Sequence, residues 1–133
     1  MQESVKQLLG ELAQQSYAGK IHFGQVVASL TLAGVESYQA DFRSHGTTYF
    51  MPDGSHHTLA LETPQVAIAD QFDAGTVVAA IRGAQRGEVM YPAFVQMVMA
   101  AGCIGYIVWL AGRHVTYFGR RGEMHIEHFP AAQ

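Results

Sequence analysis

A short run near the C-terminus, His125-Ile126-Glu127-His128, holds the side chains best suited to chemistry in this chain. Two imidazoles and a carboxylate could bind zinc or transfer protons. If the run is a β-strand, its side chains alternate between two faces, so His125 and Glu127 point one way and His128 the other. The spacing also lacks the helical i, i+4 arrangement of zinc hydrolases. We therefore predict no metal site, and expect either a local His125/Glu127 pair or polar residues on the solvent-facing side of the strand.

Cys103 is the only cysteine of the chain, so no disulfide can form within it. A reactive thiolate usually lies near a helix N-terminus or a cation, whereas Cys103 follows a glycine at the predicted start of a strand. We interpret it as a small buried apolar residue. The sequence also lacks a phosphate-binding Gly-rich loop, a dinucleotide fingerprint and a nucleophile elbow, and it predicts no cofactor.

An internal repeat indicates which elements position these residues. The second half of the chain repeats the first at an offset of 68 residues, the distance from Gly19 to Gly87. Because a repeat gives two readings of one structural unit, His57 becomes the counterpart of His125. The identical pairs include Gly19/Gly87, Ala33/Ala101, Gly34/Gly102, Tyr38/Tyr106, Thr48/Thr116, Tyr49/Tyr117, Phe50/Phe118, Gly54/Gly122 and His57/His125.

Each copy predicts two helices followed by three short strands, from apolar spacing and from glycines that end helices. The first copy predicts helices over 4–18 and 23–33 and strands over 35–42, 47–51 and 56–61. The second predicts helices over 74–86 and 92–101 and strands over 103–110, 115–118 and 124–129. The fold class is therefore α+β, with two tandem ααβββ units forming a two-layer sandwich whose antiparallel meander sheet carries the helices on one face. We expect one domain, 1–133, built of repeats over 4–61 and 73–129 and a connector over 62–72.

Composition and charge exclude several classes of partner. With 14% charged residues, a net charge of −3 and no Lys/Arg run, the chain lacks a basic surface that could follow a nucleic-acid backbone. The segment 89–112 contains no Asp, Glu, Lys or Arg and is long enough to cross a bilayer. Pro92 and Gly102 interrupt it, however, and its counterpart in the first copy is charged. We expect neither nucleic-acid nor membrane association, and a cytoplasmic protein without a secretory signal.

The first strands of the two copies differ in their pattern. In 35–42 apolar and polar side chains alternate, as is typical of a half-buried strand, whereas in 103–110 both alternating sets are apolar. Such a strand is either covered on both faces within the core or covered on one face by something outside the chain. Ile107, Trp109, Tyr106 and Tyr38 are therefore candidates for a ligand surface or an interface with a protein partner or a second copy. Burial in the core remains the alternative.

Two motifs can be compared with known families. They are Phe23-x-x-Val26…Leu30-x-x-Ala33-Gly34-Val35-x-x-Tyr38 and Gly46-Thr47-Thr48-Tyr49-Phe50, echoed at Ala101-Gly102…Tyr106 and Thr116-Tyr117-Phe118. On these motifs the chain resembles the YdfO-like (YbcV-like) family of small bacterial and prophage-associated proteins with a domain of unknown function. The resemblance covers nearly the whole chain and implies an α+β two-layer fold. It implies no catalytic residues, because none is established for the family.

These observations favour a non-enzymatic binding or regulatory module that uses an apolar sheet face. The alternative is a small enzyme or ligand-binding protein with a site between the two units, a junction that pockets favour. His125, Glu127 and His57 would supply that site. The two functions differ in one geometric respect, namely whether these three residues converge in a concave site.

The sequence also generates a first test. If the Ile107/Trp109 face is an interface, Trp109→Asp changes the oligomeric state or a ligand response while the fold survives. Light scattering measures the first property and circular dichroism the second. A variant that merely unfolds places Trp109 in the core.

Overall fold

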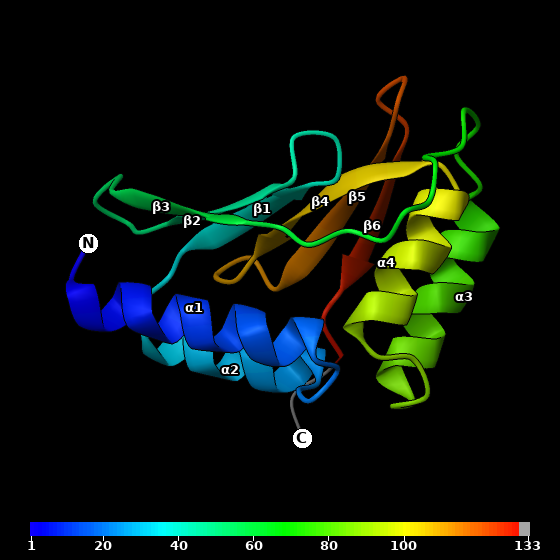
Figure 1. The fold of residues 1–133 in the computed structure, drawn as a ribbon. Coiled ribbons are helices and arrows are strands. Elements are labelled where there is room, and N and C mark those ends of the chain that lie inside the picture. The colour runs from blue at the N-terminus through cyan, green and yellow to red at the C-terminus, as the bar shows by residue number, and fades with distance from the viewer. Residues whose placement is uncertain (131–133) are drawn as a thin grey trace.

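The structure, a computed structural model that describes residues 1–130, contains four helices and one six-stranded antiparallel sheet in that part of the chain (Figure 1). The first unit comprises α1 (Glu3–Tyr17), α2 (Phe23–Leu32), β1 (Ser37–Asp41), β2 (Gly46–Phe50) and β3 (His56–Ala60). The second comprises α3 (Ala74–Gln85), α4 (Tyr91–Ala100), β4 (Cys103–Trp109), β5 (His114–Gly119) and β6 (Met124–His128). The α+β class, the two ααβββ units and the meander within each unit are confirmed.

The expected element order holds, and the bounds differ by one or two residues. The predicted first strand, 35–42, is shorter in the structure because its first residue still belongs to the end of the preceding helix. The Val35 N–H donates to the Leu30 carbonyl at 3.0 Å, while Gly34 before it adopts a φ of 85°. This left-handed residue turns the chain out of α2 and into β1.

The two units are related by an approximate twofold axis through the centre of the sheet. The strand order is β3-β2-β1-β4-β5-β6, so β1 and β4 pair at the centre. Their register places Gln39 opposite Ile107, which are equivalent positions of the two copies. The pair Tyr38↔Val108 on one side of this centre is mirrored by Ala40↔Tyr106 on the other. The axis therefore passes through the Gln39/Ile107 pair.

All four helices cover the same face of the sheet (Figure 1). Alternate strand residues on that face are buried, such as Tyr38, Ala40, Tyr106 and Val108, and they belong to one apolar cluster with helix residues such as Leu9. Burial of this kind supplies the main stabilisation of a two-layer fold. No helix within residues 1–130 has the length and apolar character that crossing a membrane would require.

The loop between α1 and α2 and the loop between α3 and α4 meet between the two helix pairs. Gly19 ends the α1 turn with a φ of 69° and Gly87 ends the α3 turn with a φ of 75°. A Cβ built on Gly19 would lie 3.8 Å from the Met90 side chain, and one on Gly87 would lie 3.7 Å from the His22 ring. His22 and Met90 are themselves equivalent positions. The two loops therefore approach each other across the same approximate axis.

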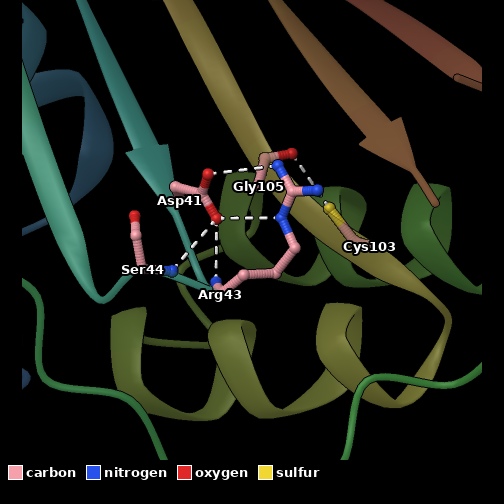
Figure 2. A network of polar contacts seen from close by, with 5 residues as sticks. All are labelled: Asp41, Arg43, Ser44, Cys103 and Gly105. Atoms are coloured by element: carbon pink, nitrogen blue, oxygen red, sulfur yellow. Dashed lines mark hydrogen bonds and ion pairs between the residues drawn. The ribbon is translucent and has the colours of Figure 1, made fainter.

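The turn after β1 is stabilised by one carboxylate. Asp41 accepts hydrogen bonds from the backbone N–H groups of Arg43 (2.8 Å) and Ser44 (3.4 Å) and pairs with the Arg43 guanidinium (Figure 2). Burial acts to raise the pKa of Asp41, but these hydrogen bonds outweigh it and hold the pKa below its usual value. Cys103 begins β4 beside this turn in the same view.

Gly102 and its counterpart Gly34 provide a matched test of packing. Both have left-handed backbones, with φ of 90° and 85°. A Cβ on Gly102 would collide with the Gln71 carbonyl of the connector, whereas one on Gly34 meets only the Met51 methyl at 3.8 Å. We expect Gly34→Ala to cost about 1–2 kcal/mol of backbone strain. Gly102→Ala should cost about 1–3 kcal/mol more because of the overlap. Urea unfolding of both variants measures the difference, and equal losses would contradict this packing.

Candidate functional site

A cavity of about 560 Å³ lies between the helices and the covered face of the sheet. Residues of both units line it, from all four helices and from inner strand positions. The lining includes every tyrosine of the chain, namely Tyr17, Tyr38, Tyr49, Tyr91, Tyr106 and Tyr117. The exposed lining residues belong to the helix–helix loops, to the adjoining helix ends and to the chain at and after the end of β6, such as His22, Gly87 and Pro130. The cavity therefore reaches solvent where the two loops meet.

Four of the tyrosines form a continuous row across the sheet. Tyr38 and Tyr49 are cross-strand neighbours whose ring centroids lie 5.2 Å apart in a stacked arrangement. Tyr106 and Tyr117, their equivalents in the second unit, lie 5.8 Å apart. Tyr38 and Tyr106 join the two pairs edge to face at 6.3 Å. Contacts between rings at these separations add stabilisation to that gained by burying the ring surface. We call this row of four tyrosines on the sheet side of the cavity the aromatic floor.

Hydrogen bonding divides the tyrosine hydroxyls into two groups. Tyr91 and Tyr106 bond to each other at 2.9 Å, and Tyr17 donates to the Ala60 carbonyl at 2.9 Å. The remaining hydroxyls, those of Tyr38, Tyr49 and Tyr117, form no hydrogen bond within residues 1–130, although these residues are only 5%, 7% and 6% exposed.

The three unpartnered hydroxyls reach the open space of the cavity. Among the described residues, no fully enclosed side-chain oxygen or nitrogen lacks a partner, so none of these three oxygens is sealed in the packing. Burial raises the pKa of Tyr38, Tyr49 and Tyr117. The phenols therefore stay protonated and offer the cavity neutral groups that both donate and accept.

A polar cluster lies at the second unit's end of the cavity, around Glu127 of β6. The Glu127 carboxylate accepts from Arg82 of α3 at 2.7 Å, from Gln85 at 3.5 Å and from His125 at 3.1 Å. Burial acts to raise the pKa of Glu127, but the hydrogen bonds from Arg82 and His125 outweigh it and lower the pKa. The His125 ring also stacks on Tyr117, with centroids 6.4 Å apart.

The structure places the predicted His125/Glu127 pair on the helix-covered face. The pair forms. The alternative, that these residues lie on the solvent-facing side of the strand, is wrong, because Arg82 of α3 binds Glu127 on the covered face. His128 does point to the opposite face, where its ring lies 5.7 Å from that of His114. Within residues 1–130, no group of three or more His, Cys, Asp or Glu side chains could hold a metal ion.

His57 does not join His125 and Glu127. It lies in β3, where it pairs with Tyr49, while the other two residues lie in β6 at the opposite edge of the six-stranded sheet. His57 and His125 are separated because they are equivalent residues. The approximate twofold axis places β3 and β6, the third strands of the two units, at opposite edges of the sheet. The three residues thus do not converge in one concave site.

The four candidates for a ligand surface or interface divide between the two faces of the sheet. Trp109 is 39% exposed on the uncovered face and donates from Nε1 to Thr116 at 3.2 Å. Ile107 lies half-buried on the same face. Tyr106 and Tyr38 instead point into the cavity. Trp109 is therefore not a core residue, and a partner on its face stays a prediction.

Cys103 is fully buried, which confirms its interpretation as a small apolar residue. Its thiol donates to the Gly105 carbonyl at 3.2 Å, a contact also drawn in Figure 2. Burial raises the pKa of the thiol to about 11, so it is protonated at neutral pH and unsuited to nucleophilic attack.

Sequence reasoning missed most of the cavity. It named Tyr49 and Tyr117 only in the repeat and the family motifs, and it gave no functional role to Tyr17, Tyr91 or Arg82. One signal was available, because Tyr38/Tyr106 and Tyr49/Tyr117 are identical between the copies. A tyrosine that is identical in both copies and points inward carries a hydroxyl that usually needs a hydrogen-bond partner. Phenylalanine would fill the same space without needing one.

Comparisons with known proteins point to a family without an assigned activity. A family model described as "Protein of unknown function (DUF1398)" matches residues 23–128. Similar relatives include "Uncharacterized protein Rv2012" from Mycobacterium tuberculosis (strain ATCC 25618 / H37Rv) and "Uncharacterized protein Mb2035" from Mycobacterium bovis, each 34% identical over 68 residues. The aligned segment covers 51% of this chain and 42% of each relative. The match thus spans less than half the length of these relatives.

The lowered pKa of Glu127 predicts a pH-dependent contribution to stability. A carboxylate whose pKa is lower in the folded state stabilises the fold above its unfolded pKa, about 4.3 for Glu. That contribution disappears as the pH falls through the folded-state pKa. Glu127→Gln should therefore be less stable than the parent protein at pH 7, and the difference should shrink below about pH 4. Thermal unfolding across pH measures it.

Glu36→Gln is the matched control for this test. Glu36 is exposed, and its carboxylate makes no hydrogen bond within the described residues. A difference between parent and Glu127→Gln that persists unchanged into acid would show that the carboxylate charge is not the cause.

Proposed function

We propose that this chain, which belongs to the DUF1398 family of proteins of unknown function, is a non-enzymatic protein that binds an apolar small molecule in the cavity between its two units. The proposal keeps the non-enzymatic binding module that the sequence favours. From the alternative it takes the site between the two units, so the site moves from the uncovered face of the sheet to the covered one.

One observation carries the proposal, namely that three tyrosine hydroxyls without a partner among residues 1–130 face a mostly apolar cavity. A hydroxyl that opens onto a cavity and has no protein partner can still donate and accept hydrogen bonds there. Tyr38, Tyr49 and Tyr117 are more than nine-tenths buried and line the cavity, so any of their hydroxyls is free to bond to a polar atom of a ligand. The volume of about 560 Å³ also falls within the range of about 300–1,000 Å³ of small-molecule pockets.

The side chains around the cavity support binding rather than catalysis. The tyrosines are neutral, because burial raises the pKa of each of the three that lack a partner among residues 1–130. The one carboxylate in the lining, Glu127, is held by an arginine and a histidine. None of these groups is poised to attack a substrate or to remove its proton.

We also propose a narrower place for the chain within this family, among the YdfO-like (YbcV-like) prophage-associated proteins. The two motifs that carry the resemblance, 23–38 and 46–50, lie inside the matched range. They form α2, β1 and β2, which supply Tyr38 and Tyr49 to the cavity.

Two glycines allow a matched test of the binding site. Gly24 and Gly10 both lie in helices, and a Cβ on either meets nothing within 4 Å. Only Gly24 lines the cavity. We expect Gly24→Phe to narrow the entrance and to weaken binding of the fluorescent probe N-phenyl-1-naphthylamine about tenfold, or about 1.4 kcal/mol. Gly10→Phe should leave probe affinity unchanged.

Fluorescence titration measures both affinities, and thermal unfolding checks that each variant folds. The same loss of affinity in both variants would place the probe elsewhere on the protein. A parent protein that gives no saturable signal would refute the proposed function.

A further inference from the structure

The two ends of the cavity differ although the repeat makes them equivalent. Glu127 and Gln85 line the end formed by the second unit. Their counterparts in the first unit are Leu59 and Tyr17, and the Tyr17 hydroxyl already bonds to the Ala60 carbonyl. The copies have thus diverged to give a charged end around Glu127 and a more apolar end, where Thr47 lines the cavity. A ligand that fits both ends is amphipathic.

Glu127 retains capacity for one more hydrogen bond. Oε2 accepts from Arg82 and Gln85, while Oε1 accepts only from His125. A carboxylate has about four lone-pair positions, so one on Oε1 is free. The carboxylate lines the cavity with only 15% of its side chain exposed, and a ligand donor is well placed to reach it.

The Tyr117 hydroxyl completes this polar end. Burial chiefly raises the pKa of Tyr117, with smaller contributions from the nearby Cys103 thiol and the Glu127 carboxylate. His125 connects the two residues, because its ring stacks on Tyr117 and its Nε2 bonds to Glu127 Oε1 at 3.1 Å. The Glu127 carboxylate can accept one more hydrogen bond, and the Tyr117 hydroxyl can donate one. Together they match a ligand group that both donates and accepts.

The charges at this end favour a neutral group. Glu127 is balanced by Arg82 at 2.7 Å, and burial raises the pKa of the surrounding tyrosines so that they stay uncharged. An anionic head would lie against the Glu127 carboxylate, and a cationic head would compete with the Arg82 guanidinium. Burying either ion without a free counter-charge is costly.

We propose that the cavity binds an amphipathic molecule whose polar head is a hydroxyl, held between Glu127 and Tyr117. The hydroxyl donates to Glu127 Oε1 and accepts from the Tyr117 hydroxyl. The apolar body extends along the tyrosine row toward Tyr38 and Tyr49. The inference rests on the proposed function and adds the chemical class and the orientation of the ligand.

Two isomeric probes test the head group. 1-Octanol and heptyl methyl ether have the same atoms, but only the alcohol has an O–H to donate. We expect the parent protein to bind octanol about tenfold more tightly than the ether, measured by displacement of N-phenyl-1-naphthylamine, since a hydrogen bond to a charged acceptor is strong. Octanoate and octylamine should both bind more weakly than octanol.

Variants of the two equivalent tyrosines test the orientation. Tyr117→Phe removes an unpartnered hydroxyl, so no hydrogen bond of the fold is lost, and the octanol-to-ether preference should fall below about threefold. Tyr49→Phe removes the equivalent hydroxyl at the more apolar end. It should change the affinities for octanol and for the ether by the same factor, so that the octanol-to-ether preference is unchanged. The pair Arg82→Gln/Glu127→Leu copies Gln14 and Leu59 of the first unit and should also abolish the preference.

The results separate this inference from the function on which it rests. Retained binding of N-phenyl-1-naphthylamine shows that a variant is folded with its cavity intact. Equal binding of the two isomers by the parent, tighter binding of octanoate or octylamine, or an equal loss of preference in both tyrosine variants would overturn the hydroxyl-headed ligand while leaving the cavity a binding site. A parent protein that binds neither the fluorescent probe nor octanol would overturn both.

Discussion

The antiparallel pairing of β1 with β4 fixes the geometry on which the cavity depends. Its register centres on Gln39 and Ile107, which joins two three-stranded meanders into one sheet and brings four helices over one face. The same register turns Tyr38 and Tyr106 toward the helices. Because side chains alternate along a strand, a slip by one residue would turn both tyrosines to the uncovered face. The aromatic floor of the cavity thus depends on this single pairing.

Approximate symmetry and its breaking have separate consequences. Symmetry supplies the matched tyrosines and the two loops that approach each other beside Gly19 and Gly87. Divergence between the units makes one end of the cavity charged, because Glu127 stands where the first unit has the apolar Leu59. The uncovered face has diverged as well, since Trp109 stands where the first unit has Asp41. The first change faces the cavity and the second faces solvent.

Much of the fold could be predicted from the sequence because its signals are local. Gly34 and Gly102 end helices through left-handed backbones that favour glycine, and both copies repeat that signal. The candidate site was less predictable. The His125/Glu127 pair follows from strand alternation alone, whereas the Arg82 contact joins residues from separate elements. His57 shows the limit most clearly, because identity between repeats establishes equivalent environments and not proximity.

The sequence by itself determined the element order, the ααβββ unit, the burial of Cys103 and the alternation that separates Tyr106 from Trp109. Each of these depends on backbone preferences or on spacing within one segment. Only the tertiary structure decided which face of the sheet the helices cover, that six tyrosines line one cavity and that three of their hydroxyls lack partners among residues 1–130. These properties depend on how distant elements pack around the β1/β4 axis, and no local pattern encodes empty space between them.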